Sequence, residues 1–597
     1  MTTDLNKQLA PVGGTERIAV LDVVRGFALI GILLMNIEFF NRATTDIGSG
    51  MQPGLAGADL WFSFFVQYFV TGKFWTMFSL LFGMGFGVML MRAETAQRNF
   101  IVPYLRRIAA LATFGALHHI FLWTGDILFS YSVAAVALLI VLYGRARYIA
   151  LSIPLLAGLG FIPGMDWMFG IAGGVAFFGF AAWFLRCPDH IRIFKFRNVP
   201  IFKIIIGIIL VAATAAILVG LLVPSLPRDA KFGLPVTGFA FLMLGILMLR
   251  YHNPVEARPW RMGVGLYAFS FFMMTAMGAT QYYFPNPDDA VIAKSAAAPG
   301  APAAPVVAAP VVAAPVVAAP VAAPAAASAV AAAKPAKGAA PAAKKPQTDA
   351  ERIAERKKER AERLAKRKAE KEHEIKVLTQ GSWSDAVALR AKHFIERAPG
   401  EVGFATVLIA MFLLGLWFMR SGIMANTRAH LPLFRKLALF ALPFGVGLGL
   451  IGSQIATHAT PGIPNGYQFA HGLTMLGNLP ACLGYVAVIV LMLNSRMFAG
   501  INILAPFGRM ALTNYLTHSL VFSTIFYGYG FGLFGIDRIT QLGCVVAMVL
   551  VQVPLSHLWL KYFRYGPMEW LWRAITYWQI PAMRVASPSS MSVPHPA

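Results

Sequence analysis

Long apolar stretches separated by short polar ones run through most of this 597-residue chain. A transmembrane helix needs about 20 mostly apolar residues, and about 12 to 14 stretches of this chain reach or approach that length. The stretches cover 18–40, 74–91, 105–123, 127–143, 148–163, 167–185, 201–223, 233–249, 262–284, 403–419, 436–456, 470–493, 510–528 and 539–560. The first is longer than the apolar part of a signal peptide, so we expect it to be retained as a helix. The pattern predicts an all-α, polytopic transmembrane bundle.

Residues 285–400 interrupt this pattern with a different kind of sequence. A Pro-Val-Val-Ala-Ala unit repeats there, and a proline every five residues prevents a continuous helix and favours extended chain. Residues 350–376 are then dense in Glu, Lys and Arg. Oppositely charged residues stand four apart at Glu359/Arg363, Glu362/Lys366 and Glu372/Lys376. This spacing predicts a solvated helix with almost no apolar face, hence one that is not packed in a core.

The chain therefore divides into five expected regions. They are an N-terminal transmembrane region (1–284), an Ala/Pro-rich linker (285–348), a charged helical segment (349–400), a C-terminal transmembrane domain (401–580) and a tail (581–597).

Composition and charge support a membrane protein over a soluble one. Apolar residues make up 57% and charged residues 13%, whereas soluble domains carry roughly a quarter charged residues. The 51 Lys and Arg against 27 Asp and Glu give a net +24. With the N-terminus placed inside and the spans alternating, inner loops carry 26 basic residues and short outer loops carry 4. This positive-inside bias predicts a bacterial inner (plasma) membrane protein with both termini cytoplasmic and residues 285–400 extracytoplasmic. We therefore expect the lipid bilayer to be the partner of this protein, and we do not expect its positive charge to bind nucleic acid.

The first expected helix carries polar residues within an apolar sequence. Asp22 and Arg25 are three residues apart and share a face, and Asn36 follows Arg25 by about three turns on the same side. Two interpretations stand side by side. The residues form a structural ion pair that docks the helix, or they form a binding face for a polar or phosphorylated substrate.

Adjacent histidines, His118 and His119, lie in the third stretch. Their side chains project about 100° apart on a helix, so at most one faces a given site. Histidine is the usual general base near neutral pH, and a buried, hydrogen-bonded structural histidine is the alternative. Asp126 lies eight residues beyond His118 on roughly the same face. It either orients the ring or caps the next helix, because Gly-Asp before an apolar run is an N-cap pattern.

Further polar candidates stand at the ends of two apolar stretches. Lys73 precedes a glycine-rich apolar helix, where a lysine can also extend along the helix to the membrane surface. Arg509, Asn514 and Tyr515 begin another stretch, and we expect all four residues to bind substrate or donor. The sequence contains no Cys pairs, zinc motif, phosphate loop or dinucleotide fingerprint, so we expect no metal site and no bound cofactor.

Four sequence blocks carry a family resemblance. Leu21-Asp22-Val23-Val24-Arg25-Gly26 with the residues up to Asn36, then 73–87, 118–126 and 508–573, resemble the YeiB-like bacterial membrane proteins, whose C-terminal half is domain of unknown function 418 (DUF418). The last block includes Gly-Arg-Met-Ala-Leu-Thr-Asn-Tyr and Gly-Pro-Met-Glu-Trp-Leu-Trp-Arg. The resemblance covers roughly 15–145 and 385–580. This chain departs from the family in carrying several more spans over 148–284 and a long insertion over 285–380, ahead of the family's outer helix around 381–396.

The family resembles, more distantly, membrane acyltransferases of the heparan glucosaminide acetyltransferase type, which begin with a similar Asp-x-x-Arg-Gly helix. This resemblance implies acyl transfer from cytosolic acyl-CoA to an envelope glycan or lipid-linked acceptor. His118, the histidine that matches the family motif, would act with Asp126 as base or acyl carrier. Arg509 would meet the donor, and Asp22, Arg25 and Asn36 would shape a substrate tunnel.

Two other functions fit the same residues. Intramembrane Asp, Arg and His also serve proton-coupled transport, which would make this chain a transporter or flippase of a polar envelope metabolite. A structural membrane component that binds a partner through its outer basic helix is the third hypothesis.

Overall fold

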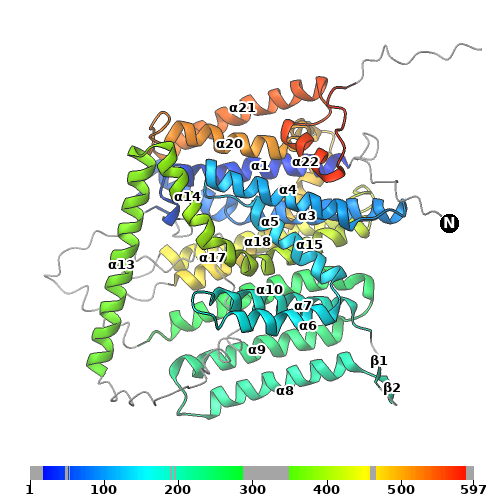
Figure 1. The fold of residues 1–597 in the computed structure, drawn as a ribbon, viewed down its shortest axis with the longest axis vertical. Helices are drawn as coiled ribbons and strands as arrows, with labels where there is room; N and C mark the ends of the chain where they lie inside the picture. Colours follow the sequence, from blue (N-terminus) through cyan, green and yellow to red (C-terminus); the bar gives the residue numbers. More distant parts are fainter. Residues whose placement is uncertain are drawn as a thin grey trace, which may run out of the picture.

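The computed structural model describes residues 18–46, 51–52, 54–188, 191–193, 196–286, 349–457 and 466–585. The expected linker from residue 287 and the expected tail from residue 586 lie outside these ranges. The described chain is a helical bundle with one short antiparallel hairpin of β1 and β2, which confirms the all-α, polytopic prediction (Figure 1).

The element bounds are as follows. They are α1 (Ala19–Phe40), α2 (Gly57–Phe65), α3 (Lys73–Thr95), α4 (Ile101–Leu117), α5 (Leu128–Tyr143), α6 (Ala146–Leu159), α7 (Trp167–Arg186), β1 (Ile191–Ile193), β2 (Phe196–Val199), α8 (Ile201–Leu222), α9 (Arg228–Tyr251), α10 (Arg258–Tyr283), α13 (Asp349–Gln380), α14 (Trp383–Arg397), α15 (Glu401–Arg420), α16 (Leu431–Lys436), α17 (Leu442–Thr457), α18 (Tyr467–Leu493), α19 (Leu504–Arg509), α20 (Ala511–Phe526), α21 (Arg538–Tyr562) and α22 (Pro567–Tyr577), with π-helical turns η3 (Val66–Val70), η4 (His118–Leu122) and η7 (Leu437–Ala441). Short 3₁₀ turns are η2 (Thr44–Asp46), η5 (Val255–Ala257), η6 (Ala398–Gly400) and η8 (Ala499–Ile503).

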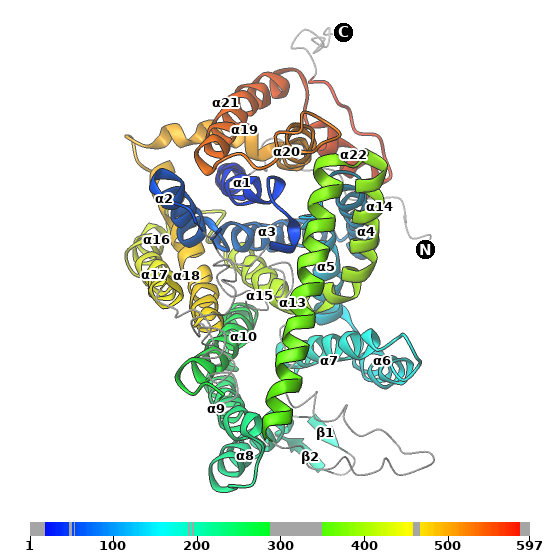
Figure 2. The ribbon, with the colours of Figure 1, turned by 90° about the vertical axis from the view of Figure 1, so that its left-hand side faces the viewer.

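Within the described residues, ten helical segments are long and apolar enough to cross a membrane, and α5 and α6 are shorter apolar helices. Helix α15 is the centre of the bundle. Nearly every residue from Phe404 to Met419 is buried, against α3, α5, α7 and α10. Helix α1 is a second buried element, packed against α3, α19, α20 and α21 (Figure 2).

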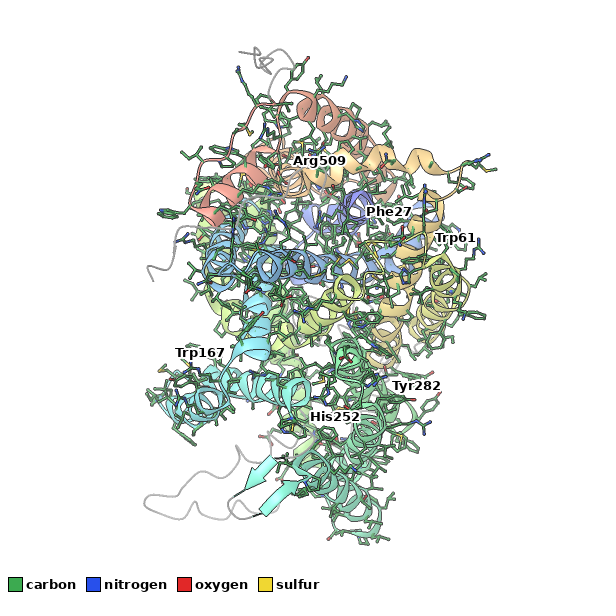
Figure 3. The ribbon with its side chains drawn as sticks, turned by 90° about the vertical axis from the view of Figure 1, so that its right-hand side faces the viewer. Phe27, Trp61, Trp167, His252, Tyr282 and Arg509 are labelled. Carbon is green, nitrogen blue, oxygen red and sulfur yellow. The ribbon has the colours of Figure 1, made fainter. Side chains whose placement is uncertain are left out.

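The additional spans of residues 148–284 form a peripheral layer. Helices α6 to α10 lie on one side of α15, and the α8–α9 pair is farthest from α1 (Figure 1). Figure 3 shows Trp167 and His252 in this layer, well separated from Phe27 and Arg509 at the opposite end of the molecule. Ile208, Val211 and Leu222 of α8 are 64%, 70% and 72% exposed. Large apolar side chains exposed in this way are expected on a helix that faces lipid.

The charged segment forms two helices at one end of the bundle. Helix α13 runs across the direction of the bundle helices, and α14 turns back beside it (Figures 1 and 2). Arg363 pairs with Glu359 at 3.7 Å as expected. In place of the other two expected pairs, Lys366 lies 4.0 Å from Glu370 and Lys368 lies 3.8 Å from Glu372. Long exposed side chains have several charged neighbours one turn away, so spacing alone does not select the pair.

The expectation that this helix lacks a packed face is wrong for its last two turns. Glu374 and Leu378 are only 3% and 4% exposed, and Leu378 joins an apolar cluster that includes residues of α1 and α20. Glu374 accepts a hydrogen bond from the Thr44 amide at 2.8 Å. A single leucine and one buried carboxylate are too weak a pattern to distinguish from a solvated helix in the sequence.

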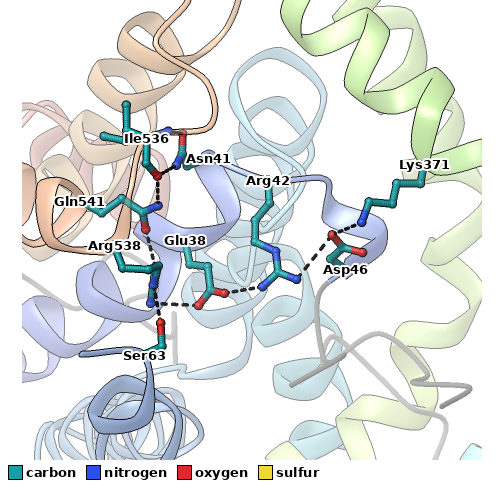
Figure 4. A network of polar contacts seen from close by, with 9 residues as sticks. All are labelled: Glu38, Asn41, Arg42, Asp46, Ser63, Lys371, Ile536, Arg538 and Gln541. Atoms are coloured by element: carbon teal, nitrogen blue, oxygen red, sulfur yellow. Dashed lines mark hydrogen bonds and ion pairs between the residues drawn. The ribbon is translucent and has the colours of Figure 1, made fainter. Parts of the chain in front are cut away.

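A chain of ion pairs joins α13, α1 and α21 (Figure 4). Lys371 contacts Asp46 at 2.7 Å, and Asp46 lies 3.5 Å from Arg42, which also pairs with Glu38. Glu38 contacts Arg538 at 3.1 Å. The Arg538 side chain also hydrogen-bonds Ser63 at 2.9 Å, and Gln541. The network thus fixes where α1 ends relative to α2, α13 and α21.

We expect Arg538→Met to lower the free energy of unfolding by about 3 kcal/mol, because it leaves the largely buried Glu38 carboxylate, whose side chain is 12% exposed, with one cation fewer. The measurement is denaturant unfolding of the detergent-solubilised protein. Arg363→Met is the matched control. Its pair is exposed on both sides, so the change should be within about 0.5 kcal/mol. Equal effects of the two substitutions would contradict a structural role for the network.

Candidate functional site

The close crossing of α1 and α19 positions the first two charged candidates. A Cβ added to Gly508 would lie 1.9 Å from the backbone oxygen of Asp22, so only glycine allows this approach. The contact brings Arg25 of α1 and Arg509 of α19 to one cavity. The Arg25 guanidinium pairs with the Asp22 carboxylate at 2.9 Å, as the three-residue spacing predicts.

Two cavities lie near α1 among the described residues. The larger one, which Arg25 and Arg509 line, has a volume of about 230 Å³ and is enclosed by α1, α3, α4, α5, α19, α20 and α22. Four arginines line it together with one carboxylate, that of Glu569, and with apolar side chains of α3, α4 and α5. The arginines are Arg25, Arg107, Arg509 and Arg573. The Arg107 guanidinium stacks 3.8 Å from the centre of the Trp572 ring. A cavity so lined favours an anionic group joined to an apolar one.

The Glu569 carboxylate is held against the start of α20. It accepts hydrogen bonds from the amides of Leu512 and Thr513 at 2.7 and 3.0 Å and from the Thr513 hydroxyl at 2.6 Å. Burial raises the pKa of Glu569, and the Thr513 hydrogen bonds partly oppose this rise. Glu569 therefore caps a helix and does not neutralise all four arginines.

His118 and Asp126 form a buried pair. His118 Nδ1 lies 2.8 Å from Asp126 Oδ1, and His118 Nε2 lies 2.7 Å from the Ser519 hydroxyl. The other carboxylate oxygen of Asp126 accepts the Phe129 amide at 2.8 Å. The two interpretations of Asp126 are therefore both correct, because one oxygen orients the ring and the other holds the first turn of α5.

A π-helical turn sets the direction of these side chains. The Trp123 amide bonds the His118 carbonyl at 2.9 Å, which closes η4 at the end of α4. Such turns occur frequently at functional sites. The His119 ring packs 5.3 Å from Phe394 of α14 instead. The two adjacent histidine rings thus contact different elements, and α14 of the charged segment packs against His119.

A smaller cavity, of about 80 Å³, lies on the other side of Tyr515. Three residues line both cavities, namely Ile32, Ile127 and Tyr515. The smaller cavity is lined by Met35, Asn36, Phe39, Gln67, Thr71, Trp75, Trp123, Gly125, Asp126, Phe404, Tyr467, His471, Thr474 and Met475 in addition. The Tyr515 ring lies 5.1 Å from that of His118. Asp126 thus lines the smaller cavity, and His118 is buried behind it, next to the Tyr515 ring that lines both cavities.

The structure brings together most of the candidates from the sequence. Arg25 and Arg509 line the larger cavity, and Asn36 and Asp126 line the smaller one. The polar stripe of α1 thus extends along both cavities, and Tyr515 stands between them.

Four candidates line neither cavity, namely Asp22, Lys73, His118 and Asn514. His118 is buried between Asp126 and Ser519. The Asp22 carboxylate pairs with Arg25. Lys73 is fully buried, and its Nζ donates to the Thr71 carbonyl at 3.2 Å, so it does not reach the membrane surface. Asn514 donates to the Phe507 carbonyl at 3.1 Å and the Ser556 hydroxyl at 3.2 Å, which ties α20 to α19 and α21. The geometry of Asn514 is that of a structural residue.

Four residues at the site were not among the sequence candidates. Ser519 follows Tyr515 by one helical turn, and this spacing was a usable signal. Arg107 was one of the basic residues assigned to the inner loops, and Glu569 and Arg573 stand in the Gly-Pro-Met-Glu-Trp-Leu-Trp-Arg motif of the family resemblance. Only the packing of α4 and α22 against α20 shows that these charges face a cavity.

Comparisons with known proteins agree with the C-terminal resemblance. Residues 418–579 match the family described as "Protein of unknown function (DUF418)". The chain is 23% identical to the uncharacterised protein YxaH of Bacillus subtilis over 586 residues, which cover 96% of this chain and 97% of that protein.

Two further relatives match over shorter lengths. The uncharacterised protein YeiB of Escherichia coli is 43% identical over 86 residues, 14% of this chain and 20% of YeiB. An uncharacterised 39.9 kDa protein of Bacillus acidopullulyticus is 40% identical over 111 residues, 19% of this chain and 30% of that protein. No solved structure matches the chain. The fold and these matches define a polytopic membrane protein whose C-terminal segment resembles the DUF418 proteins.

We expect Ser519→Ala to destabilise the protein by about 1 to 3 kcal/mol, because it removes the hydrogen-bond partner of His118 Nε2 in a buried site. Ser523→Ala is the matched control, since Ser523 is equally buried on α20 but bonds the Leu520 carbonyl of its own helix. Thermal unfolding of the two variants in detergent checks this. A larger loss for Ser523→Ala would contradict the hydrogen bond to His118.

Proposed function

We propose that this protein is a membrane acyltransferase that moves an acyl group from acyl-CoA, on the cytoplasmic side, to an envelope glycan or lipid-linked acceptor. The observation that carries the proposal is the buried His118–Asp126 pair beside two chemically different cavities: Asp126 lines the smaller one, and Tyr515, whose ring lies 5.1 Å from that of His118, lines both. A transferase needs such an arrangement, because its donor and acceptor must approach one catalytic group from different directions.

The hydrogen bond to Asp126 prepares His118 for proton transfer. A carboxylate on Nδ1 fixes the tautomer that carries its proton there, which leaves Nε2 free to accept one. In the proposed reaction the acceptor hydroxyl attacks the thioester carbonyl, a C–O bond forms and the C–S bond breaks. His118 takes the hydroxyl proton and returns it to the leaving thiolate. Access to Nε2 requires the Ser519 hydroxyl to give up its 2.7 Å hydrogen bond to that atom.

The smaller cavity has the character of an acceptor site. It combines aromatic rings with hydrogen-bonding side chains such as Asn36, Gln67 and His471. The buried Trp75 indole N–H, also in its wall, has no hydrogen-bond partner among the described residues. Hydroxyl-bearing molecules are bound by such mixed surfaces, because rings cover their apolar faces while polar groups pair with their hydroxyls.

The charge distribution supports the proposed direction of transfer. Arg107, Arg509 and Arg573, which line the larger cavity, all lie in segments that the positive-inside rule assigns to the cytoplasmic side. The smaller cavity includes Asn36 and Phe39, which lie near the opposite end of α1 from Arg25 of the larger cavity.

We expect His118→Ala to lower the rate of acyl-CoA turnover by the purified protein by about 10²- to 10⁴-fold, the usual contribution of a general base. His119→Ala is the matched control. It removes a neighbouring buried histidine that contacts α14, not Asp126, and should retain turnover within about threefold, well below the general-base effect. The measurement is release of free CoA in the presence of envelope extract as acceptor. Equal rates for wild type and His118→Ala would overturn the proposal.

A proton-coupled transporter is the second candidate. The observation that favours it is the thin wall of Ile32, Ile127 and Tyr515 between the cavities, which resembles a gate between two half-channels. Reconstituted vesicles distinguish the two functions. Uptake of labelled envelope sugars that follows a pH gradient and needs no acyl donor would establish transport and exclude acyl transfer as the main activity.

A further inference from the structure

We infer that the arginine-lined cavity is a binding site for a phosphoryl group carried on a long apolar or flexible arm. The first argument is charge. The wall of the cavity carries the four guanidinium groups against the single Glu569 carboxylate, and Asp22 adds a second carboxylate from outside the wall. This excess of basic over acidic lining residues attracts an anion such as a phosphomonoester, which carries about −1.5 to −2 at neutral pH.

The second argument is geometry. The four arginines come from α1, α4, α19 and α22, four separate elements that converge on one cavity. Like charges brought together in a partly buried space repel one another, and a bound anion relieves this cost. Guanidinium groups are also the side chains best suited to phosphate, because each offers two parallel N–H donors.

The third argument is the shape and lining of the cavity beyond the arginines. Phe78, Leu81 and Phe82 of α3 form an apolar wall. Along α1, Arg25 precedes Asn36 by 11 residues, or about 16 Å of helix. Along α4, Arg107 precedes His118 by the same number of residues. A ligand held by phosphate at the arginines therefore needs an arm of this order to reach the His118–Asp126 pair.

Two classes of molecule have this chemistry, a nucleotide thioester such as acyl-CoA and a lipid with a phosphate headgroup. Identifying the ligand as the acyl donor rests on the proposed function, whereas the phosphate site itself does not. We therefore separate binding from turnover in the test.

The experiment titrates full-length protein in detergent with acetyl-CoA, with a short-chain phosphatidic acid and with inorganic phosphate, and measures binding by calorimetry. We expect one of the two arm-bearing ligands to bind more tightly than inorganic phosphate. Arg107→Gln and Arg573→Gln should each weaken this binding by about 10- to 100-fold, as expected for loss of a charge-assisted contact. Arg106→Gln is the matched control, because Arg106 precedes Arg107 but contacts Trp578 outside the cavity. The affinity of the Arg106→Gln variant for the same ligand should stay within about twofold of the wild-type affinity.

The outcomes are distinguishable. Binding that is retained in His118→Ala but lost in Arg107→Gln supports the phosphate site whether or not the protein turns over acyl-CoA. Preference for the lipid over acetyl-CoA keeps the phosphate site and removes acyl-CoA as donor. The inference is overturned if neither arm-bearing ligand binds, or if Arg107→Gln and Arg573→Gln bind like Arg106→Gln while all variants unfold at the wild-type temperature.

Discussion

The constraint on which this structure depends is that a polar group buried among apolar helices must find its partner within the protein. The Asp126 carboxylate is the clearest case. One oxygen holds the His118 ring at 2.8 Å and the other holds the Phe129 amide at 2.8 Å. The same residue therefore holds the first turn of α5 and sets the direction of the imidazole. Because these tasks share one carboxylate, the local fold and the candidate chemistry are inseparable.

The same constraint explains how distant segments are joined. Glu38, near the end of α1, is paired with Arg42, which follows the helix, and with Arg538 from α21. Asn514 is satisfied by α19 and α21, and Glu569 by the first turn of α20. Apolar packing between membrane helices is weakly specific, since lipid is as apolar as the helices. These polar contacts supply the specificity that fixes the register of α1, α20 and α21 around the two cavities.

The helices of residues 148–284 are separate from the helices that enclose the two cavities. The helices of residues 148–284 add a peripheral layer that contributes no side chain to either cavity. The charged segment is closer to the site, because α14 packs on η4 and its Arg390 donates to the Phe121 carbonyl at 3.1 Å. The charged segment is thus anchored next to the candidate site through α14, while most of α13 remains exposed.

The sequence by itself determined the class of fold and the pairing of polar residues within one helix. Apolar runs of membrane length predict helices whatever their packing, and a three-residue spacing is enough to pair Asp22 with Arg25. His118 meets Asp126 in a different way from the predicted helical repeat, because the helical segment ends at Leu122 and the non-helical residues 123–127 bring the carboxylate back to the ring. Ser519 reaches His118 across 401 residues of sequence, and Arg107, Arg573 and Glu569 meet only because α4, α20 and α22 pack together. Only the tertiary structure decided these contacts, because apolar helices carry little information about which faces meet, and a cavity belongs to several helices at once.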